Sequence, residues 1–316
     1  MPNRVLTSFC VMCVTVIFAT VASAGSIHPV DDDEDDLVPT GKGYGERKEI
    51  NTPGKGHDKG EAGKGKPGTN ISYHGGPVML GTTNVYYIWY GNNWGGNTAK
   101  SILENLASHM GGSPYFNINT TYYNGANVHV SNSVAFKKSI DVPVGPYGTS
   151  LSDGEIQSIV SDAIASNQLP KDTSGVYFVL TSADVTASSG FCTQYCGWHT
   201  YGTIGGSSIK YSFVGNPDRC PSACAEQIGK SPNGNVGADG MASIIAHELE
   251  EAVTDPLLNA WYDRSGMENA DKCAWTFGTT HVAGNGSLYN MTLGGSNYLI
   301  QRNWLNVGNG SCALAY

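Results

Sequence analysis

Residues 247–256 read His-Glu-Leu-Glu-Glu-Ala-Val-Thr-Asp-Pro, and this stretch carries the strongest indication of fold and chemistry. Residues four apart share one face of an α-helix, so His247 and Glu251 would project together, with Glu248 beside them. The pattern H-E-x-x-E differs by one residue from the H-E-x-x-H of zincin peptidases, in which two histidines hold zinc and the glutamate acts as base. Because a carboxylate can also bind zinc, the stretch predicts a zincin-like helix.

A zinc site needs a third ligand, and the segment that follows offers two acids. Glu268 and Asp271 are three residues apart and would share a face of a helical turn. The pair resembles the glutamate ligand and the orienting aspartate of gluzincin peptidases. We therefore expect three metal ligands, His247, Glu251 and Glu268. Glu248 would be the catalytic base and Asp271 would orient His247, although the roles of Glu268 and Asp271 could be reversed.

Two more residues are alternative ligands or neighbours of the ligands. His199 lies in a Gly-rich segment between two C-x3-C pairs and could reach the metal from another element, or line a groove over the helix. Asp255 follows Glu251 by four but precedes Pro256, where helical geometry is disfavoured, so it would end the helix or support a ligand. A purely structural interpretation stays open, because glutamate-rich helix faces are common and a single histidine is more often structural than a ligand.

The rest of the chain predicts strands that alternate with helices. Strands are expected over residues 85–90, 126–130, 135–142, 176–181 and 208–214. Helices are expected over 98–109, after Ser152 with Glu155 in a capping box, and from the cap Asp239 to about Val253. This order predicts the α/β (α+β) class, a single zincin-like domain whose mixed sheet is packed by helices.

The amino terminus has the composition of an exported chain. Residues 1–24 predict a signal peptide, with Arg4, an apolar run and the small residues Ala22-Ser23-Ala24. The run is shorter than the roughly 20 residues of a membrane span, and no other candidate span is present. Residues 25–72, acidic and then Gly/Lys-rich, predict a disordered leader before a globular domain over 73–316.

Six cysteines follow the signal peptide, and an even number in an exported chain predicts disulfides. The sequence does not fix their pairing. Our expectation is two local loops and one long closure: Cys192–Cys196, Cys220–Cys224 and Cys273–Cys312. A zinc site built from the two C-x3-C pairs is the alternative.

Other sequence features narrow the class of function. Glycosylation sequons occur at Asn70, Asn119, Asn285, Asn290 and Asn309. The net charge of −9 gives no reason to expect a nucleic-acid partner. There is no G-x-S-x-G elbow of a serine hydrolase, and the Gly-Lys repeats lack the spacing of a phosphate-binding P-loop.

Several separated segments resemble the EXORDIUM family, also called the phosphate-induced protein family. They are residues 73–78, 85–91, 196–199, 247–256, 259–262 and 268–273. The resemblance covers residues 73–316 and implies a secreted protein of the apoplast or cell wall, linked in plants to growth and to brassinosteroid or nutrient responses. The acidic and Gly/Lys-rich leader departs from the plant pattern.

Two functions follow from these observations. The first is a secreted zinc-dependent, peptidase-like hydrolase that acts on an extracellular peptide, protein or cell-wall component. The second is a non-catalytic extracellular signalling or binding protein on the same fold.

Overall fold

The fold is described here from a computed structural model that covers residues 1, 37–42, 70–92, 94 and 98–316. The predicted signal peptide, apart from Met1, and most of the predicted leader lie outside these residues. Apart from Met1 and residues 37–42, the described residues begin at Asn70.

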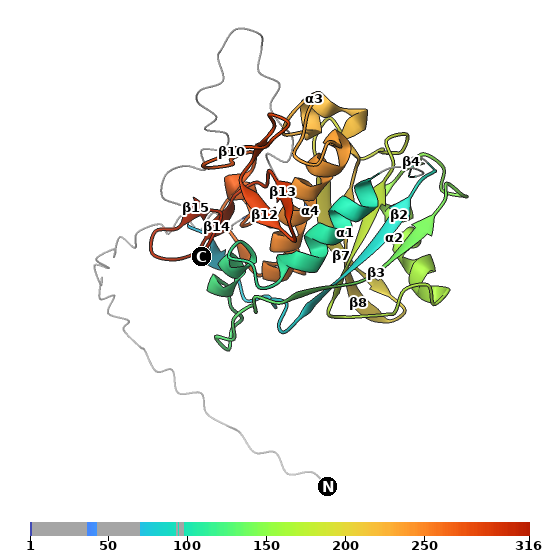
Figure 1. The fold of residues 1–316 in the computed structure, drawn as a ribbon. Helices are drawn as coiled ribbons and strands as arrows, with labels where there is room; N and C mark the ends of the chain where they lie inside the picture. Colours follow the sequence, from blue (N-terminus) through green and yellow to red (C-terminus); the bar gives the residue numbers. More distant parts are fainter. Residues whose placement is uncertain (2–36, 43–69, 93, 95–97) are drawn as a thin grey trace, which may run out of the picture. The chain divides into compact units, whose positions relative to one another are not determined.

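A five-stranded mixed sheet forms the centre of the domain (Figure 1). Its strands lie in the order β3-β2-β5-β8-β7, of which the first four are parallel and β7 is antiparallel to β8. The strands are β2 (Thr83–Tyr90), β3 (Val134–Val142), β5 (Gly175–Thr181), β7 (Gly197–Ile204) and β8 (Ser207–Val214). Strands β2 and β5 are buried apart from Asn84, as their near-continuous apolar sequences require.

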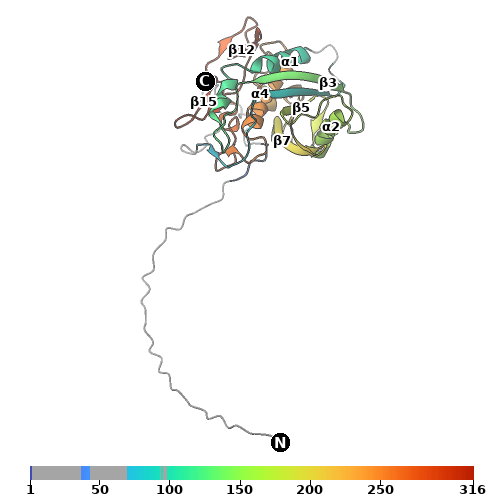
Figure 2. The same cartoon turned by 90° about the horizontal axis from the view of Figure 1, so that it is seen from below.

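Three long helices cover the two faces of the sheet (Figures 1 and 2). Helices α1 (Ala99–Met110) and α4 (Val236–Thr254) pack together on one face, and α2 (Asp153–Ala165) packs against the other. Ser152 and Glu155 form the predicted capping box at the start of α2. The mixed α/β class expected from the sequence is therefore confirmed.

The remaining elements are short. Five two-stranded sheets pair β1 (Ser72–Tyr73) with β9 (Trp261–Tyr262), β4 (Ser150–Leu151) with β6 (Thr186–Ala187), β10 (His281–Val282) with β11 (Leu288–Tyr289), β12 (Met291–Leu293) with β13 (Ser296–Tyr298), and β14 (Asn303–Leu305) with β15 (Ser311–Ala313). The short helices are η1 (Phe116–Thr121), η2 (Pro217–Arg219), α3 (Pro221–Cys224) and η3 (Asp271–Cys273).

Helix α4 is enclosed on all sides, because residues 237–254 are all buried. The sheet covers one side, α1 a second, and η1 together with segments of the carboxy-terminal third covers the rest. A helix buried all round is normally apolar, yet this one carries five polar side chains in its last two turns. These are His247, Glu248, Glu250, Glu251 and Thr254. Buried charges require partners, so the surroundings of α4 indicate where chemistry can occur.

Two local predictions are wrong. Residues 126–130 do not form a regular strand: Asn127 has a φ of 57°, and the side chain of Asn124 accepts hydrogen bonds from Ala126 N and Val128 N in a turn. Helix α4 is capped by Asn235, whose side chain accepts from Ala238 N, and not by Asp239. In both places an asparagine side chain organises the backbone, which apolar periodicity does not reveal.

The disulfides confirm one of the three expected pairs. Cys273–Cys312 is present, but the C-x3-C pairs are joined to each other, as Cys192–Cys220 and Cys196–Cys224. All four sulfurs of these pairs are therefore in disulfides, which rules out the alternative cysteine zinc site. The predicted local loops are wrong because the hairpin of β7 and β8 brings the two cysteine pairs together, and sequence proximity does not show this.

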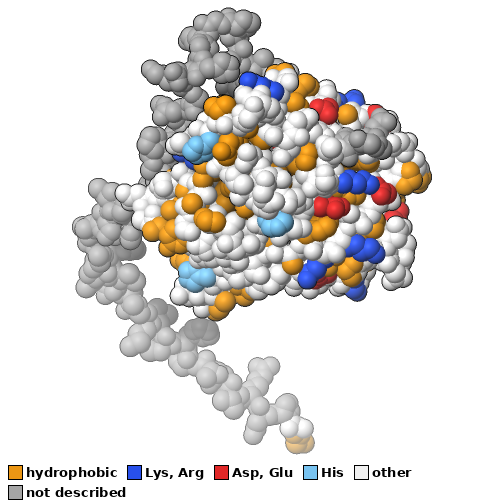
Figure 3. All heavy atoms as spheres, viewed as in Figure 1, with side chains coloured by type: hydrophobic (Ala, Val, Ile, Leu, Met, Phe, Trp, Pro, Cys, Tyr) orange, Lys and Arg blue, Asp and Glu red, His pale blue; other side chains and the backbone are white. Residues whose placement is uncertain are grey.

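Charged side chains on the surface occur singly or in small groups on the face that Figure 3 shows. On the face seen in Figure 3, acidic and basic side chains are interspersed, without a large patch of one sign. No helix within the described ranges is long and apolar enough to cross a membrane.

Candidate metal centre

The polar end of α4 lies at the centre of a buried cluster of acids and histidines. Helix α4 contributes His247, Glu248 and Glu251, strand β7 contributes His199, and the segment 268–271 contributes Glu268 and Asp271. Each of these side chains is at most 2% exposed. Residues from three separate parts of the chain therefore meet in one enclosed place.

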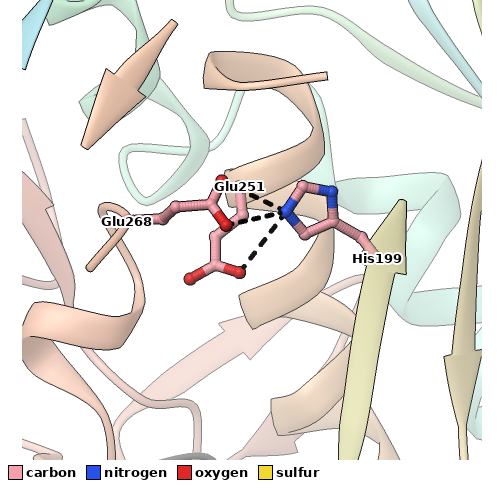
Figure 4. A group of neighbouring side chains, drawn as sticks. All are labelled: His199, Glu251 and Glu268. Carbon is pink, nitrogen blue, oxygen red and sulfur yellow. Dashed lines mark hydrogen bonds and ion pairs between the residues drawn. The ribbon is translucent and has the colours of Figure 1, made fainter. Parts of the chain in front are cut away.

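The first half of the cluster joins His199, Glu251 and Glu268 (Figure 4). The Nε2 atom of His199 lies 3.2 Å from both carboxylate oxygens of Glu268 and 3.7 Å from Oε2 of Glu251. One donor atom from each residue lies within 4.8 Å of the others. Three ligand-type groups thus point at a common centre.

The second half shares Glu251 with the first and joins it to His247 and Asp271. The Nε2 atom of His247 lies 3.1 Å from Oε1 of Glu251 and 3.5 Å from Oδ1 of Asp271. The same Oε1 atom accepts a hydrogen bond of 3.0 Å from the backbone N–H of Asp271. Glu251 therefore connects the two histidines, one through each carboxylate oxygen.

Local structure fixes the segment that carries the two downstream acids. The Oδ1 atom of Asp263 accepts from the backbone N–H groups of Ser265 and Met267, which closes a turn just before Glu268. Asp271 then accepts from Glu268 N at 3.3 Å. The acids are held on a short turn that enters the 3-10 helix η3, and not on a second long helix.

Glu248 lies close to the start of β7. A Cβ atom on Gly197 would lie 3.1 Å from Oε1 of Glu248, and neither oxygen of Glu248 has a hydrogen-bond partner in the described part of the chain. An unpartnered buried carboxylate is costly, so a partner for it, such as a cation or a water molecule, is expected at the edge of the cluster.

Asp255 lies just beyond the end of α4, where its Oδ1 atom accepts from the backbone N–H groups of Asn259 and Ala260. It therefore holds the loop that follows the helix. Burial raises its pKa to about 6, and the carboxylate of Glu251 contributes to the rise. Its other oxygen has no hydrogen-bond partner among the residues that the structure covers.

Burial and mutual repulsion shift the titration of the cluster. Burial raises the pKa of Glu248 and Glu268 well above the usual glutamate range, and the neighbouring carboxylates raise it further. Burial also lowers the pKa of His199 to about 4, so its imidazole is neutral at pH 7. For His247, the carboxylates of Glu251 and Asp271 outweigh burial and raise the pKa well above its usual value.

The donor set fits a zinc ion. Imidazole nitrogen and carboxylate oxygen are common zinc ligands, and bonds of about 2.0–2.1 Å place tetrahedral ligands roughly 3.4 Å apart. The nitrogen–oxygen distances within the two halves run from 3.1 to 3.7 Å. Several buried cluster atoms, including Oε2 of Glu251 and Oδ1 of Asp271, have no hydrogen-bond partner within the described ranges, and a cation would satisfy them.

The predicted site residues come together, but in a different grouping from the expected one. His247 and Glu251 meet across one helical turn as the spacing predicts. Glu268, however, faces His199, and His247 faces Asp271, so the expected trio of His247, Glu251 and Glu268 is divided between the two halves. His199, a secondary candidate in the sequence, belongs to the first half and contacts both Glu251 and Glu268.

The sequence contained a signal that could have placed His199 in the site, but using it required the prediction of a β-hairpin. The alternating runs 197–204 and 207–214 flank Gly205-Gly206, a typical two-residue hairpin turn. Recognising it would have placed His199 on a strand next to β8, opposite Ser212.

Comparison with protein families identifies the lineage of the chain. The family described as "Phosphate-induced protein 1 conserved region" matches residues 71–303. The chain belongs to this family. The matched region of the phosphate-induced protein 1 family spans β1 to β14 and includes every residue of the cluster.

The chain is similar to several plant proteins. Protein EXORDIUM-like 3 of Arabidopsis thaliana is 33% identical over 274 residues, which cover 75% of this chain and 81% of the relative. EXORDIUM-like 5 of the same plant is 31% identical over 74% of this chain and 75% of its own length. Protein PHOSPHATE-INDUCED 1 of Nicotiana tabacum is 26% identical over 64% of this chain and 71% of its own. No solved structure matches the chain.

Proposed function

We propose that the cluster binds zinc and that the protein is a secreted, zinc-dependent hydrolase of peptide-like bonds. The observation that carries the proposal is the convergence of His199, Glu251 and Glu268 on one buried centre, with His247 on the other oxygen of Glu251. Three disulfides favour an oxidising compartment, which supports secretion to the extracellular space or cell wall.

The helix provides the acid–base chemistry that such a hydrolase needs. When bound, zinc would act as a Lewis acid and lower the pKa of a bound water to about 7. Glu248 lies next to His247, and neither of its oxygens has a hydrogen-bond partner among the residues that the structure describes, so it can take a proton from water and return it to the leaving amine. A carboxylate whose pKa burial raises can hold that proton between the two transfers.

The ligand assignment extends the one expected from the sequence. Glu251 is the shared ligand, and His199 and Glu268 are preformed around it. His247 remains the expected ligand of the H-E-x-x-E helix, and Asp271 positions it. The zincin-like character of α4 rests on this arrangement together with Glu248, whose oxygens have no hydrogen-bond partner in the described part of the chain.

The first prediction concerns Glu248. Glu248→Gln keeps the shape and one oxygen but removes the proton acceptor, so we expect stoichiometric zinc with turnover on a broad peptide library reduced by about 100-fold or more. Protein from a secretory host would be analysed for bound metal and for cleavage. Equal turnover of wild type and variant would contradict the catalytic role, and absence of zinc from both would contradict the site.

The enclosure of the cluster favours one alternative, a non-catalytic extracellular signalling or binding protein that uses zinc for stability. Cavities of about 360 and 390 Å³ lie elsewhere, lined by residues outside the cluster. Stoichiometric zinc, a fall in stability in chelator and no cleavage by wild type would support this alternative over the hydrolase.

A further inference from the structure

Residues 37–42, Leu-Val-Pro-Thr-Gly-Lys, lie against segments of the domain that are distant from them in the sequence. His199 N donates a 3.1 Å hydrogen bond to Gly41 O, and Leu37 N donates one of 3.1 Å to Arg264 O. Pro39 and Gly41 are buried. The segment therefore runs from the turn that precedes Glu268 to the strand that carries His199.

The contact leaves no room for a side chain at Gly41. Its φ is +70°, and a Cβ atom there would overlap the carbonyl oxygen of His199 and lie 3.5 Å from Cδ2 of Leu258. At the other end, a Cβ on Gly266 would lie 3.0 Å from Leu37 O. The backbone of the segment thus approaches the domain closely at both ends.

Lys42 anchors the end of the segment. Its ammonium group lies 2.5 Å from Oδ2 of Asp153 and 5.4 Å from the ring centroids of both Tyr195 and Trp198. An ion pair combined with aromatic rings holds the cation in one place.

The position of the segment relates it to the metal centre. Among the described strands, β7 pairs only with β8, so its outer edge offers backbone groups to another extended segment. The carbonyl oxygen of Gly41 accepts a hydrogen bond from the backbone N–H of His199, whose imidazole is part of the cluster. With residues 37–42 in place, the side chains of His199, Glu251 and Glu268 are at most 1% exposed.

We propose that the outer edge of β7 is a binding surface for an extended peptide and that residues 37–42 are its built-in occupant, which closes the metal centre while bound. The surface would select a glycine opposite His199 and a lysine beside Asp153. The closing role rests on the proposed zinc site, whereas the docking of the segment does not. A substrate or partner peptide would compete with residues 37–42 for the same edge.

Amide hydrogen exchange tests the docking without reference to metal or activity. The full chain would be compared with Gly41→Ala, and with Gly75→Ala as a control, because Gly75 also has a positive φ of 93° but no atom within 4 Å of its added Cβ. We expect exchange of the His199 amide to accelerate at least about tenfold in Gly41→Ala and to stay unchanged in the control. Equal exchange in all three proteins would overturn the proposal.

A second measurement tests the docking even if the Gly41→Ala variant does not fold. A protease site inserted between residues 43 and 69 allows the folded chain to be cut, and a labelled peptide of residues 36–43 is then added to the cut and washed protein. We expect saturable binding of the labelled peptide, weakened at least about tenfold by Gly41→Ala in the peptide. No binding, or equal binding of both peptides, would overturn the docking.

Zinc loss into a chelator separates this proposal from the proposed function. Removal of the segment should speed zinc loss at least about tenfold, because it uncovers the centre. Equal rates before and after its removal would refute the closing role and leave the zinc site standing. A protein that binds no zinc would refute the site, and the exchange and peptide measurements would still decide the docking.

Discussion

At the scale of the residue, Glu251 determines what the cluster can do. It stands where a zincin has its second histidine, and its two oxygens face different imidazoles. A histidine there offers one nitrogen to one metal, whereas a carboxylate can join two groups. The substitution that weakens the sequence motif therefore allows His199 to enter the cluster.

His199 should be a ligand and not a structural residue. We expect His199→Ala to lower zinc affinity by more than about 100-fold, whereas Asp271→Asn should cost about 10–100-fold as the loss of a positioning partner. Zinc competition titrations would measure both, with His281→Ala as a control on the exposed strand β10. A larger effect of Asp271→Asn than of His199→Ala would make Asp271 the ligand and His199 the positioning residue. The zinc affinity of His247→Ala would show whether His247 is also a ligand.

Zinc uptake should release protons. The pKa values of His247 and Glu268, both proposed ligands, are raised well above their usual ranges, which favours the protonated forms without a cation, and a ligand must lose its proton to bind. We expect release of at least about one proton per zinc at pH 7 and an affinity that falls as pH falls. Calorimetry in two buffers of different ionisation heat measures this number, and a heat independent of buffer would contradict it.

At the scale of the element, the contact between α4 and β7 sets the position of the site. A Cβ on Gly197 would meet Cγ2 of Ile244 at 2.5 Å and the carbonyl oxygen of Phe213 at 2.9 Å. Only glycine lets the strand approach the helix this closely. His199 reaches Glu251 because of this approach, two residues along the same strand.

Gly197→Ala should therefore destabilise the protein by about 1–3 kcal/mol, because a buried backbone carbonyl and a core side chain must move. Gly202→Ala on the same strand is the matched control, since the three atoms nearest to its Cβ would all belong to the flexible end of the Gln157 side chain. Denaturant unfolding would give both free energies. Similar values for the two variants would show that the helix and strand tolerate a wider separation.

Periodicity predicted the main elements well and the site only in part. The buried strands β2, β5 and β8 and the helices α1 and α2 follow from apolar spacing and from one capping box. Strand β7 was missed because its glycines and polar residues break the apolar pattern. The grouping of His199 with Glu268 depends on two loops and a hairpin, and such long-range geometry leaves no mark in local spacing.

At the scale of the whole molecule, folding should decide which sequons carry glycans. Asn119 is fully buried, and the side-chain amide of Asn290 donates to both Phe277 O and Ile300 O. A glycan on either would prevent this packing. Asn70, Asn285 and Asn309 are exposed.

Protein from a eukaryotic secretory host should therefore carry no glycan at Asn119 or Asn290, whatever the occupancy of the other three sites. Peptide mapping after enzymatic deglycosylation would locate each modified asparagine through its conversion to aspartate. A glycan at Asn119 in folded protein would contradict the burial of that residue.

The crossed cysteine pairs have a consequence for biosynthesis. Cys192–Cys220 and Cys196–Cys224 each span 28 residues, whereas the partners within each C-x3-C pair are only four apart. In an unfolded chain, short loops close with less loss of entropy, so oxidation first favours the wrong, local bonds. Correct bonds form once the β7–β8 hairpin has assembled. A disulfide isomerase in the secretory pathway would therefore govern how much of the chain matures with His199 in place.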